Sequence, residues 1–164
     1  MVATMAASKQ LVLFRVAGQM FGVEIELIKE IVPYQDVTPV PETYDFVEGI
    51  INLRGKIVTV IDMRRRLRAQ VIAQEKSTRI LILDIDGKFM GLIVDAASEV
   101  VRVPLESIGP PPELISEVGT NYITGVVRLG DRLIVLLELR QVLSAEEVGR
   151  LDDLIRVLYG EAAG

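Results

Sequence analysis

The sequence contains no cysteine and no histidine. Without cysteine the chain cannot form disulfides, zinc–thiolate sites or a cysteine nucleophile. Without histidine it lacks the commonest general base and a frequent ligand of transition metals. Ser98, Ser107 and Ser116 have no histidine to activate them, which excludes a serine–histidine triad. We therefore expect a protein with no catalytic residues, no bound metal and no cofactor.

The sequence also lacks an excess of positive charge and long apolar runs. Its net charge is −5, whereas a general nucleic-acid binder carries a basic field. No stretch approaches the roughly 18 uncharged apolar residues of a membrane-spanning helix, and the opening MVATMAASKQ has no apolar run of the signal-peptide kind. These absences predict a cytoplasmic protein that neither binds nucleic acid nor inserts into a membrane.

The sequence does contain an internal duplication. Gly18 falls on Gly87, and Glu30 falls on Glu99, at one constant shift. Agreement of glycines, an acid and the apolar rhythm indicates two related copies rather than chance. Two pairs of segments match: LVLFRVAGQMFGVEIELIKEIV (11–32) with ILILDIDGKFMGLIVDAASEVV (80–101), and VEGIINLRGKIVTVIDMRRRL (47–67) with ITGVVRLGDRLIVLLELRQVL (123–143).

Each copy is typical of short strands joined by tight turns. The pairs Ala17-Gly18 and Asp86-Gly87 lie between apolar runs, as in a two-residue β-hairpin. This pattern predicts an all-β fold of two small antiparallel barrels. KIVTVID (56–62) and RLIVLLEL (132–139) are nearly all apolar. Strands that are apolar on both faces are expected if the two barrels press against each other.

The duplication sets the predicted domain ranges. The first barrel is expected over residues 10–68, a polar connection over 69–78, the second barrel over 79–143 and an amphipathic helix over 144–159. Ser144 and Glu147 form a capping box at the start of that helix. Such a helix packs on its own barrel or docks on a partner, and the first is the commoner case. The residues at helical spacing are Val148, Leu151, Leu154, Ile155 and Leu158, and Gly160 ends the pattern.

Two charged clusters have both structural and functional interpretations. Asp84 and Asp86 project from one face of a strand, so they could bind a cation or serve an enzyme, but DIDG is more simply a strand running into a turn. The run Arg64-Arg65-Arg66 is expected to be a solvated end of an element, with contact to an acidic protein as the alternative. Asp62 and Glu138 end corresponding strands, which predicts that they accept backbone hydrogen bonds.

Arg54 is the most informative candidate for binding. Gly49 and Leu53 recur in the second copy and are interpreted as scaffold, whereas Asn52, Arg54 and Gly55 do not recur. An arginine can bind a carboxylate through two hydrogen bonds, although a solvated turn arginine is the commoner case. If the barrel closes, Glu30 could lie near Arg54.

These residues carry a resemblance to a known family. GIINLRGKIVTVIDMRRRL (49–67) and IELIKEIVPYQDVTPVPETYDFVEGI (25–50) closely resemble the CheW-like domain, and the match extends over about residues 10–143. The resemblance implies two SH3-like five-stranded β-barrels packed around a shared hydrophobic core, without catalysis. It also implies an adaptor that couples the cytoplasmic tip of chemoreceptors to the histidine kinase CheA and is recruited to membrane receptor arrays.

The resemblance also implies where partners bind. A receptor hairpin would occupy a groove between the barrels, and the kinase would contact the first barrel through Asn52, Gly55 and Lys56. The dense arginine run and the long tail leave open an adaptor of a parallel chemosensory pathway, and a regulatory fragment of a kinase is a further alternative. The groove residues implied are Glu30, Arg54, Ile28, Ile31, Val100 and Val101.

Overall fold

The computed structural model describes residues 7–41, 43–67, 75–111 and 122–159. Strands account for most of it, and no helix in these ranges is long and apolar enough to cross a membrane. The elements are β1 (Ser8–Val16), β2 (Gln19–Glu24), the 3₁₀-helix η2 (Ile25–Leu27), β3 (Ile28–Pro33), β4 (Val47–Leu53), β5 (Lys56–Asp62), α1 (Met63–Arg66), β6 (Arg79–Ile85), β7 (Lys88–Val94), β8 (Ala96–Pro104), η3 (Leu105–Ser107), β9 (Ile108–Gly109), β10 (Ile123–Leu129), β11 (Arg132–Leu137), η4 (Leu139–Gln141) and α3 (Ala145–Tyr159).

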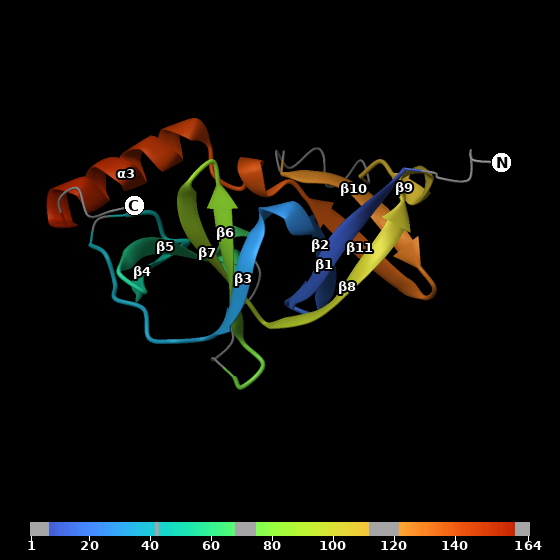
Figure 1. Ribbon diagram of the computed structural model, residues 1–164, viewed down its shortest axis with the longest axis horizontal. Helices are drawn as coiled ribbons and strands as arrows, with labels where there is room; N and C mark the ends of the chain where they lie inside the picture. The colour runs from blue at the N-terminus through green and yellow to red at the C-terminus, as the bar shows by residue number, and fades with distance from the viewer. Residues whose placement is uncertain (1–6, 42, 68–74, 112–121, 160–164) are drawn as a thin grey trace.

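The strands form two sheets that lie side by side (Figure 1). One has five strands in the order β3-β6-β7-β5-β4, and the other has six in the order β8-β1-β2-β11-β10-β9, of which β9 is only two residues long. The prediction of an all-β fold of two small barrels is confirmed. The extra short strand is a difference from the expected five.

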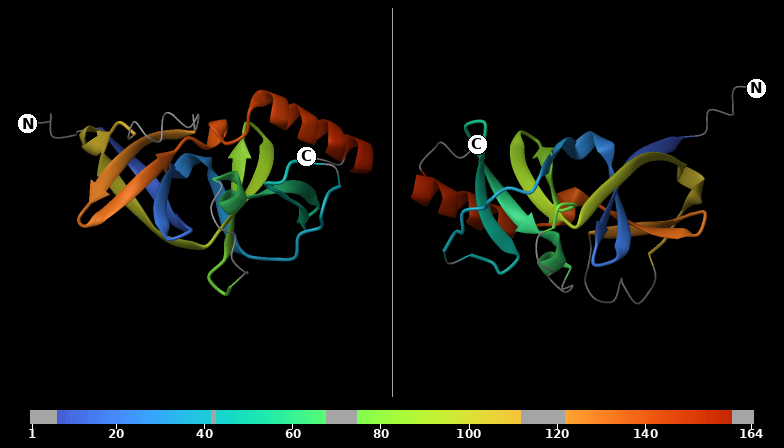
Figure 2. Two further views of the ribbon diagram at one scale, coloured as in Figure 1. Left: turned by 180° about the vertical axis from the view of Figure 1, so that it is seen from behind. Right: turned by 90° about the horizontal axis from the view of Figure 1, so that it is seen from below.

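The two copies of the duplication exchange their first hairpins (Figure 2). The β1–β2 hairpin lies between β8 and β11, and the β6–β7 hairpin lies between β3 and β5. Each exchanged hairpin pairs antiparallel with one neighbouring strand, β8 or β3, and parallel with the other, β11 or β5. The ranges 10–68 and 79–143 therefore each supply strands to both sheets, and the sheets do not follow the consecutive barrels that the sequence predicts. Of the predicted connection 69–78, residues 69–74 lie outside the described residues.

The exchange explains why strands are apolar on both faces. Along β1, Leu11 and Leu13 face the interior of the six-stranded sheet, whereas Val12 and Phe14 face a cluster shared by both sheets. In β5, Val58 and Val60 face the interior of the five-stranded sheet, and Ile61 faces the shared cluster. Each of these strands is thus buried on both faces, as the apolar runs predict. A shared cluster of this kind makes the two sheets one cooperative body.

The terminal helix packs on its own chain. Ser144 and Glu147 form the predicted capping box, because the Glu147 N–H donates to Ser144 Oγ at 3.1 Å and the Ser144 N–H donates to Glu147 Oε1 at 2.8 Å. Leu151 and Ile155 are buried, and Lys88 of β7 forms an ion pair with Asp152. The helix therefore lies against the five-stranded sheet (Figure 1). Gly160, the predicted stop, lies outside the described residues.

Candidate functional site

Glu30 and Arg54 meet at the surface of the five-stranded sheet. Glu30 lies in β3, and Arg54 lies in the turn between β4 and β5, so the residues come from the two opposite edges of that sheet. Their side chains form an ion pair and are 29% and 65% exposed. The sequence predicts that Glu30 lies near Arg54 only if the barrel closes, and the two side chains are indeed in contact. The pair joins the two edges at a place that a partner protein can reach.

The turn that carries Arg54 holds it in an unfavourable backbone conformation. Arg54 has φ of 52° and Gly55 has φ of 91°, as in the two-residue turns that favour Asn-Gly or Asp-Gly. Asn52 stabilises this turn, because its Oδ1 accepts a hydrogen bond from the Gly55 N–H at 2.8 Å. An arginine in the left-handed region is costly and uncommon. Such a residue at an exposed tip suggests that function, not stability, selects it.

Replacing Arg54 with asparagine is expected to raise the free energy of unfolding by about 0.5–1 kcal/mol, because asparagine adopts positive φ readily. Loss of the exposed ion pair, which contributes about 0–1 kcal/mol, subtracts from this gain, so the gain is measured as the difference from a control variant that loses a similar pair. Urea denaturation measures the difference. Arg132→Asn is the matched control, since Arg132 also forms an exposed ion pair but lies in a strand without positive φ. An equal loss of stability in both variants would contradict the strain at Arg54.

Two lysines make the surroundings of Arg54 basic. Lys29 Nζ and Lys56 Nζ both lie over the Phe89 ring, at 5.3 and 4.4 Å from its centroid. Neither lysine forms an ion pair with a described residue. Lys29, Arg54 and Lys56 outnumber the two acids beside them, Glu30 and Asp84, the cross-strand neighbour of Phe89, and leave this surface with a small net positive charge. The Arg54 surface, defined by Glu30, Arg54, Lys56 and Lys29, is therefore complementary to an acidic partner.

The second copy contains a related but different pair. Glu99 of β8, which matches Glu30, forms an ion pair with Arg132 at the start of β11. In the alignment of the copies Arg132 falls on Lys56, while Gly130 falls on Arg54. Gly130 has φ of 62° and accepts that conformation without steric cost. The duplication has kept an acid–arginine pair on each sheet and has moved the arginine out of the turn in one of them.

The predicted apolar residues divide into exposed and inward-facing ones. Ile31 is 40% exposed and Val100 is 49% exposed. Ile28 and Val101 are half-buried and pack against core clusters. Ile31 lies on β3 and Val100 on β8, which are edge strands of different sheets. Ile31 follows Glu30 in β3 but points to the opposite face of the strand, because Glu30 pairs with Ile82 of the five-stranded interior and Ile31 with Leu81 of the shared cluster. Val100 follows Glu99 in β8 in the same way.

The aspartates considered for a cation or an enzyme have other partners. Asp84 Oδ1 accepts a hydrogen bond from the Gly87 N–H at 2.9 Å, as Asn52 Oδ1 does from the Gly55 N–H in the β4–β5 turn. Asp86 lies in the turn and pairs with Arg140 at 3.0 Å. Among the described residues no group of three or more acids is placed to hold a metal ion. The interpretation of DIDG as a strand and turn is confirmed.

The prediction of a solvated arginine run is wrong for Arg64. Its side chain is 0% exposed, and its Nε and Nη2 donate to the two oxygens of Asp62 at 3.0 Å each. Asp62 also accepts from the Arg64 N–H at 2.9 Å, so its predicted role in backbone hydrogen bonding is confirmed. Arg64 Nη1 lies 3.4 Å from Asp95 Oδ1. Arg64 therefore belongs to the core and not to a binding surface.

Charge keeps Arg64 protonated despite its burial. Burial lowers the pKa of Arg64, but the hydrogen bond and charge of Asp62, with the charges of Asp95 and Glu48, outweigh it and leave the pKa above its ordinary value. Arg66 has a similar anchoring role, because its guanidinium lies over the Phe46 ring and its Nε donates to the Val142 carbonyl at 2.7 Å. The recurrence of Arg64 as Arg140 does not reveal this burial, since the Arg140 side chain is exposed.

Comparison with known proteins gives one consistent family. The profile described as the CheW-like domain matches residues 10–147. The chain is 32% identical over 148 residues to "Chemotaxis protein CheW" of Klebsiella aerogenes, covering 90% of this chain and 89% of that protein. It is 34% identical over 149 residues to "Chemotaxis protein CheW" of Treponema pallidum, covering 88% of each.

A solved structure agrees with the fold. The crystal structure of scaffolding protein TtCheW from Thermoanaerobacter tengcongensis superimposes with a TM-score of 0.78 and 36% sequence identity. The superposition covers 86% of this chain and 96% of that chain. Sequence and fold therefore indicate the same family over nearly the whole of both proteins.

Proposed function

Because the chain belongs to the CheW family, we propose that it joins a chemoreceptor tip to a CheA-type histidine kinase in one signalling complex. Members of this family are non-catalytic adaptors of chemotaxis, and that general function holds for this chain. The specific part of the proposal is that this chain binds both a receptor tip and the kinase. It would place the protein at receptor arrays through its partners, without insertion of its own chain into the membrane.

The observation that carries the proposal is the Arg54 surface. It combines an exposed ion pair with two lysines that have no acidic partner among the described residues. The exposed aliphatic side chain of Ile31 lies next to it on the other face of β3. Interfaces of this kind gain affinity from the apolar residues and orientation from the charges. We assign Glu30, Arg54 and Ile31 to receptor contact, with Ile28 supporting them from the half-buried side. Val100 and Val101 of β8 supply the corresponding contact on the other sheet.

The kinase is assigned to the turn itself. Asn52 fixes the turn through Gly55, and Lys56 presents its ammonium group beside Phe89. These residues form one end of the β4–β5 hairpin, at the edge of the five-stranded sheet. A receptor and a kinase that bind neighbouring parts of one rigid hairpin would be held at a fixed distance and orientation, without any chemical step. Burial of apolar area contributes about 25 cal/mol per Å² before the costs of association.

Arg54→Glu is expected to weaken binding of the receptor tip, of the kinase or of both by at least about tenfold, which is about 1.4 kcal/mol. The substitution places a second carboxylate beside Glu30 and keeps an equally unfavourable residue in the turn, so folding is little changed. Titration calorimetry with a purified receptor tip and a CheA-type kinase from the same organism measures both affinities.

Arg132→Glu is the matched control, because it reverses the arginine of the related pair on the other sheet. The proposal requires a larger loss from Arg54→Glu than from Arg132→Glu for at least one partner. Unchanged affinities in the Arg54 variant, with a folded protein, would refute the assignment of this surface. Failure of the unmodified chain to bind either partner would refute the proposed coupling itself.

A further inference from the structure

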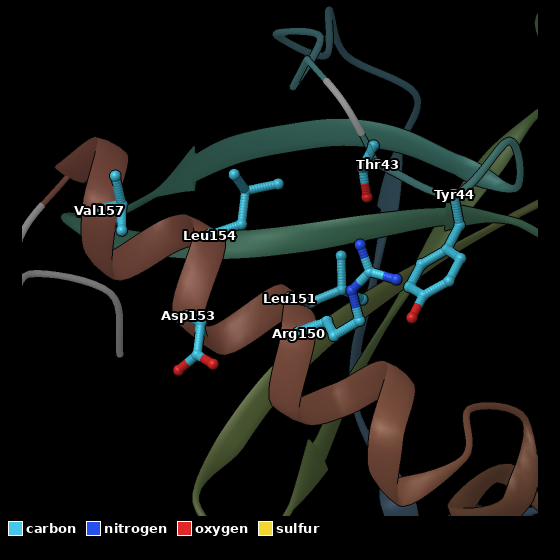
Figure 3. Close-up of a pocket in the computed structure, with 7 residues that line it drawn as sticks. All are labelled: Thr43, Tyr44, Arg150, Leu151, Asp153, Leu154 and Val157. Carbon is cyan, nitrogen blue, oxygen red and sulfur yellow. The ribbon is translucent and has the colours of Figure 1, made fainter.

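A groove separates the terminal helix from the segment that leads into β4 (Figure 3). It has a volume of about 470 Å³, and Thr43 and Tyr44 line one side of it. Arg150, Leu154 and Val157 line the other side from α3. These three residues are spaced by four and then three positions, so they form one stripe along the helix. The parallel stripe with Leu151 and Ile155 is the one buried against the sheet.

The groove presents apolar side chains that nothing in the described residues covers. Val157 is 81% exposed, the most among the large exposed hydrophobic residues of the described chain. Leu158, next to it, is also exposed. In its last two turns the helix therefore exposes apolar side chains that do not pack against the five-stranded sheet. An exposed apolar stripe beside a hollow is typical of a surface that binds another segment.

The polar groups of the groove indicate the charge of that segment. Arg150 lies over the Tyr44 ring at 5.4 Å and forms no ion pair with a described residue. Asp153, the one acid among the described residues of the lining, is 3.4 Å from Arg156 and is thus already paired. The hydroxyl of Thr43 is buried and has no hydrogen-bond partner in the part of the chain that the structure describes. A buried hydroxyl without a partner is unfavourable, and Arg150 is a cation available to a carboxylate.

The groove is separate from the Arg54 surface. Thr43 and Tyr44 precede Val47, the first residue of β4, whereas Arg54 follows Leu53, the last. The two ends of this strand are about 20 Å apart at roughly 3.3 Å per residue. A ligand in the groove and a partner at the turn would therefore occupy opposite ends of one hairpin.

From these observations we propose that the groove binds a segment of a partner protein in which an aspartate or glutamate stands within a helical turn of large aliphatic or aromatic side chains. The carboxylate pairs with Arg150, and the apolar side chains pack on Leu154 and Val157. This makes the terminal helix a second docking site, independent of the coupling proposed above.

A peptide array tests the proposal with the full chain. The probes are capped peptides in which one glutamate is placed one to four residues from two leucines, each paired with the same peptide carrying glutamine. We expect the glutamate peptides to bind at least fivefold more tightly than their glutamine partners. Binding shifts in the NMR spectrum should fall on Thr43, Tyr44 and Arg150. Failure of the glutamate peptides to bind better than the glutamine peptides overturns the proposal.

Three variants separate the groove from other sites. Arg150→Gln and Val157→Ser are each expected to weaken binding at least fivefold, and both residues are exposed, so the fold should persist. Arg128→Gln, at an exposed arginine of β10 on the other sheet and outside the groove lining, should bind normally. Equal binding by Arg150→Gln and the unmodified chain overturns the proposal. If Arg54→Glu abolishes peptide binding, the peptides occupy the Arg54 surface and the proposal is again wrong.

A shortened chain that ends at Tyr159 tests whether the chain's own residues 160–164 occupy the groove. Residues 160–164 include Glu161 and two alanines, so this segment is the chain's own candidate for the groove. Equal peptide binding by the full and shortened chains supports a partner segment. Binding that appears only in the shortened chain would show that the groove belongs to residues 160–164, which overturns the proposal for a partner.

Discussion

Gly49→Ala is expected to lower the free energy of unfolding by about 3–5 kcal/mol, a large share of the 5–15 kcal/mol that stabilises an ordinary domain. A Cβ at this position would stand 2.0 Å from the Thr38 carbonyl oxygen. Because that oxygen belongs to the backbone, no rotamer change relieves the contact. The φ of Gly49 is +150°, a conformation that is nearly restricted to glycine.

The clash would also break a local pairing. Thr38 and Ile50 exchange two backbone hydrogen bonds of 2.9 Å each, and the chain cannot move away from Gly49 without losing them. This pairing holds the segment after β3 against β4, next to the strand that carries the Arg54 turn. The loss should therefore reach the binding surface as well as the stability. Urea denaturation and a titration with the receptor tip measure the two effects.

Gly109→Ala is the matched control for this prediction. It lies in the corresponding pairing of the second copy, but the nearest atoms to an added Cβ are 3.9 Å away, an ordinary contact. We expect a cost below about 1 kcal/mol there. Equal effects of the two substitutions would show that close backbone approach is not the reason for glycine at position 49.

Arg64→Ala is expected to lower the free energy of unfolding by about 3–5 kcal/mol, the usual result of removing one member of a buried ion pair. The substitution leaves the carboxylate of Asp62 buried without its main cation. It also removes a contact to Asp95, whose Oδ2 accepts a hydrogen bond from the Ala17 N–H at 2.7 Å. Since Ala17 lies in the β1–β2 turn and Asp62 ends β5, the network links the two sheets. Thermal and urea denaturation measure the loss.

Two further variants test whether the loss of stability comes from the buried ion pair. Arg65→Ala, at a side chain that is partly exposed and pairs with Glu48 at 3.2 Å, should cost less than about 1 kcal/mol. The double variant Asp62→Leu with Arg64→Met should recover part of the loss, because no charge then remains buried. A cost below about 1 kcal/mol for Arg64→Ala would contradict the role assigned to this network.

Local patterns predicted much of the fold correctly, because each depends on neighbouring residues. The Asp86-Gly87 turn and the Ser144–Glu147 capping box form as their residue types favour. Their geometry is set by backbone conformation and by hydrogen bonds across three residues. The comparison of the two copies also singled out Arg54 as a residue outside the common scaffold. The structure adds what the comparison could not show, namely its positive φ and the lysines beside it.

The sequence alone determined that the protein is a duplicated β-rich chain without the side chains of a histidine- or cysteine-dependent enzyme, because composition and short-range spacing suffice for that. Only the tertiary structure decided that the copies exchange hairpins, that Arg64 is buried while Arg140 is exposed, and which stripe of the terminal helix remains open. The physical reason is that an apolar strand can pair with several partners of similar pattern. The choice among them depends on contacts between residues far apart in the chain, which no local pattern records.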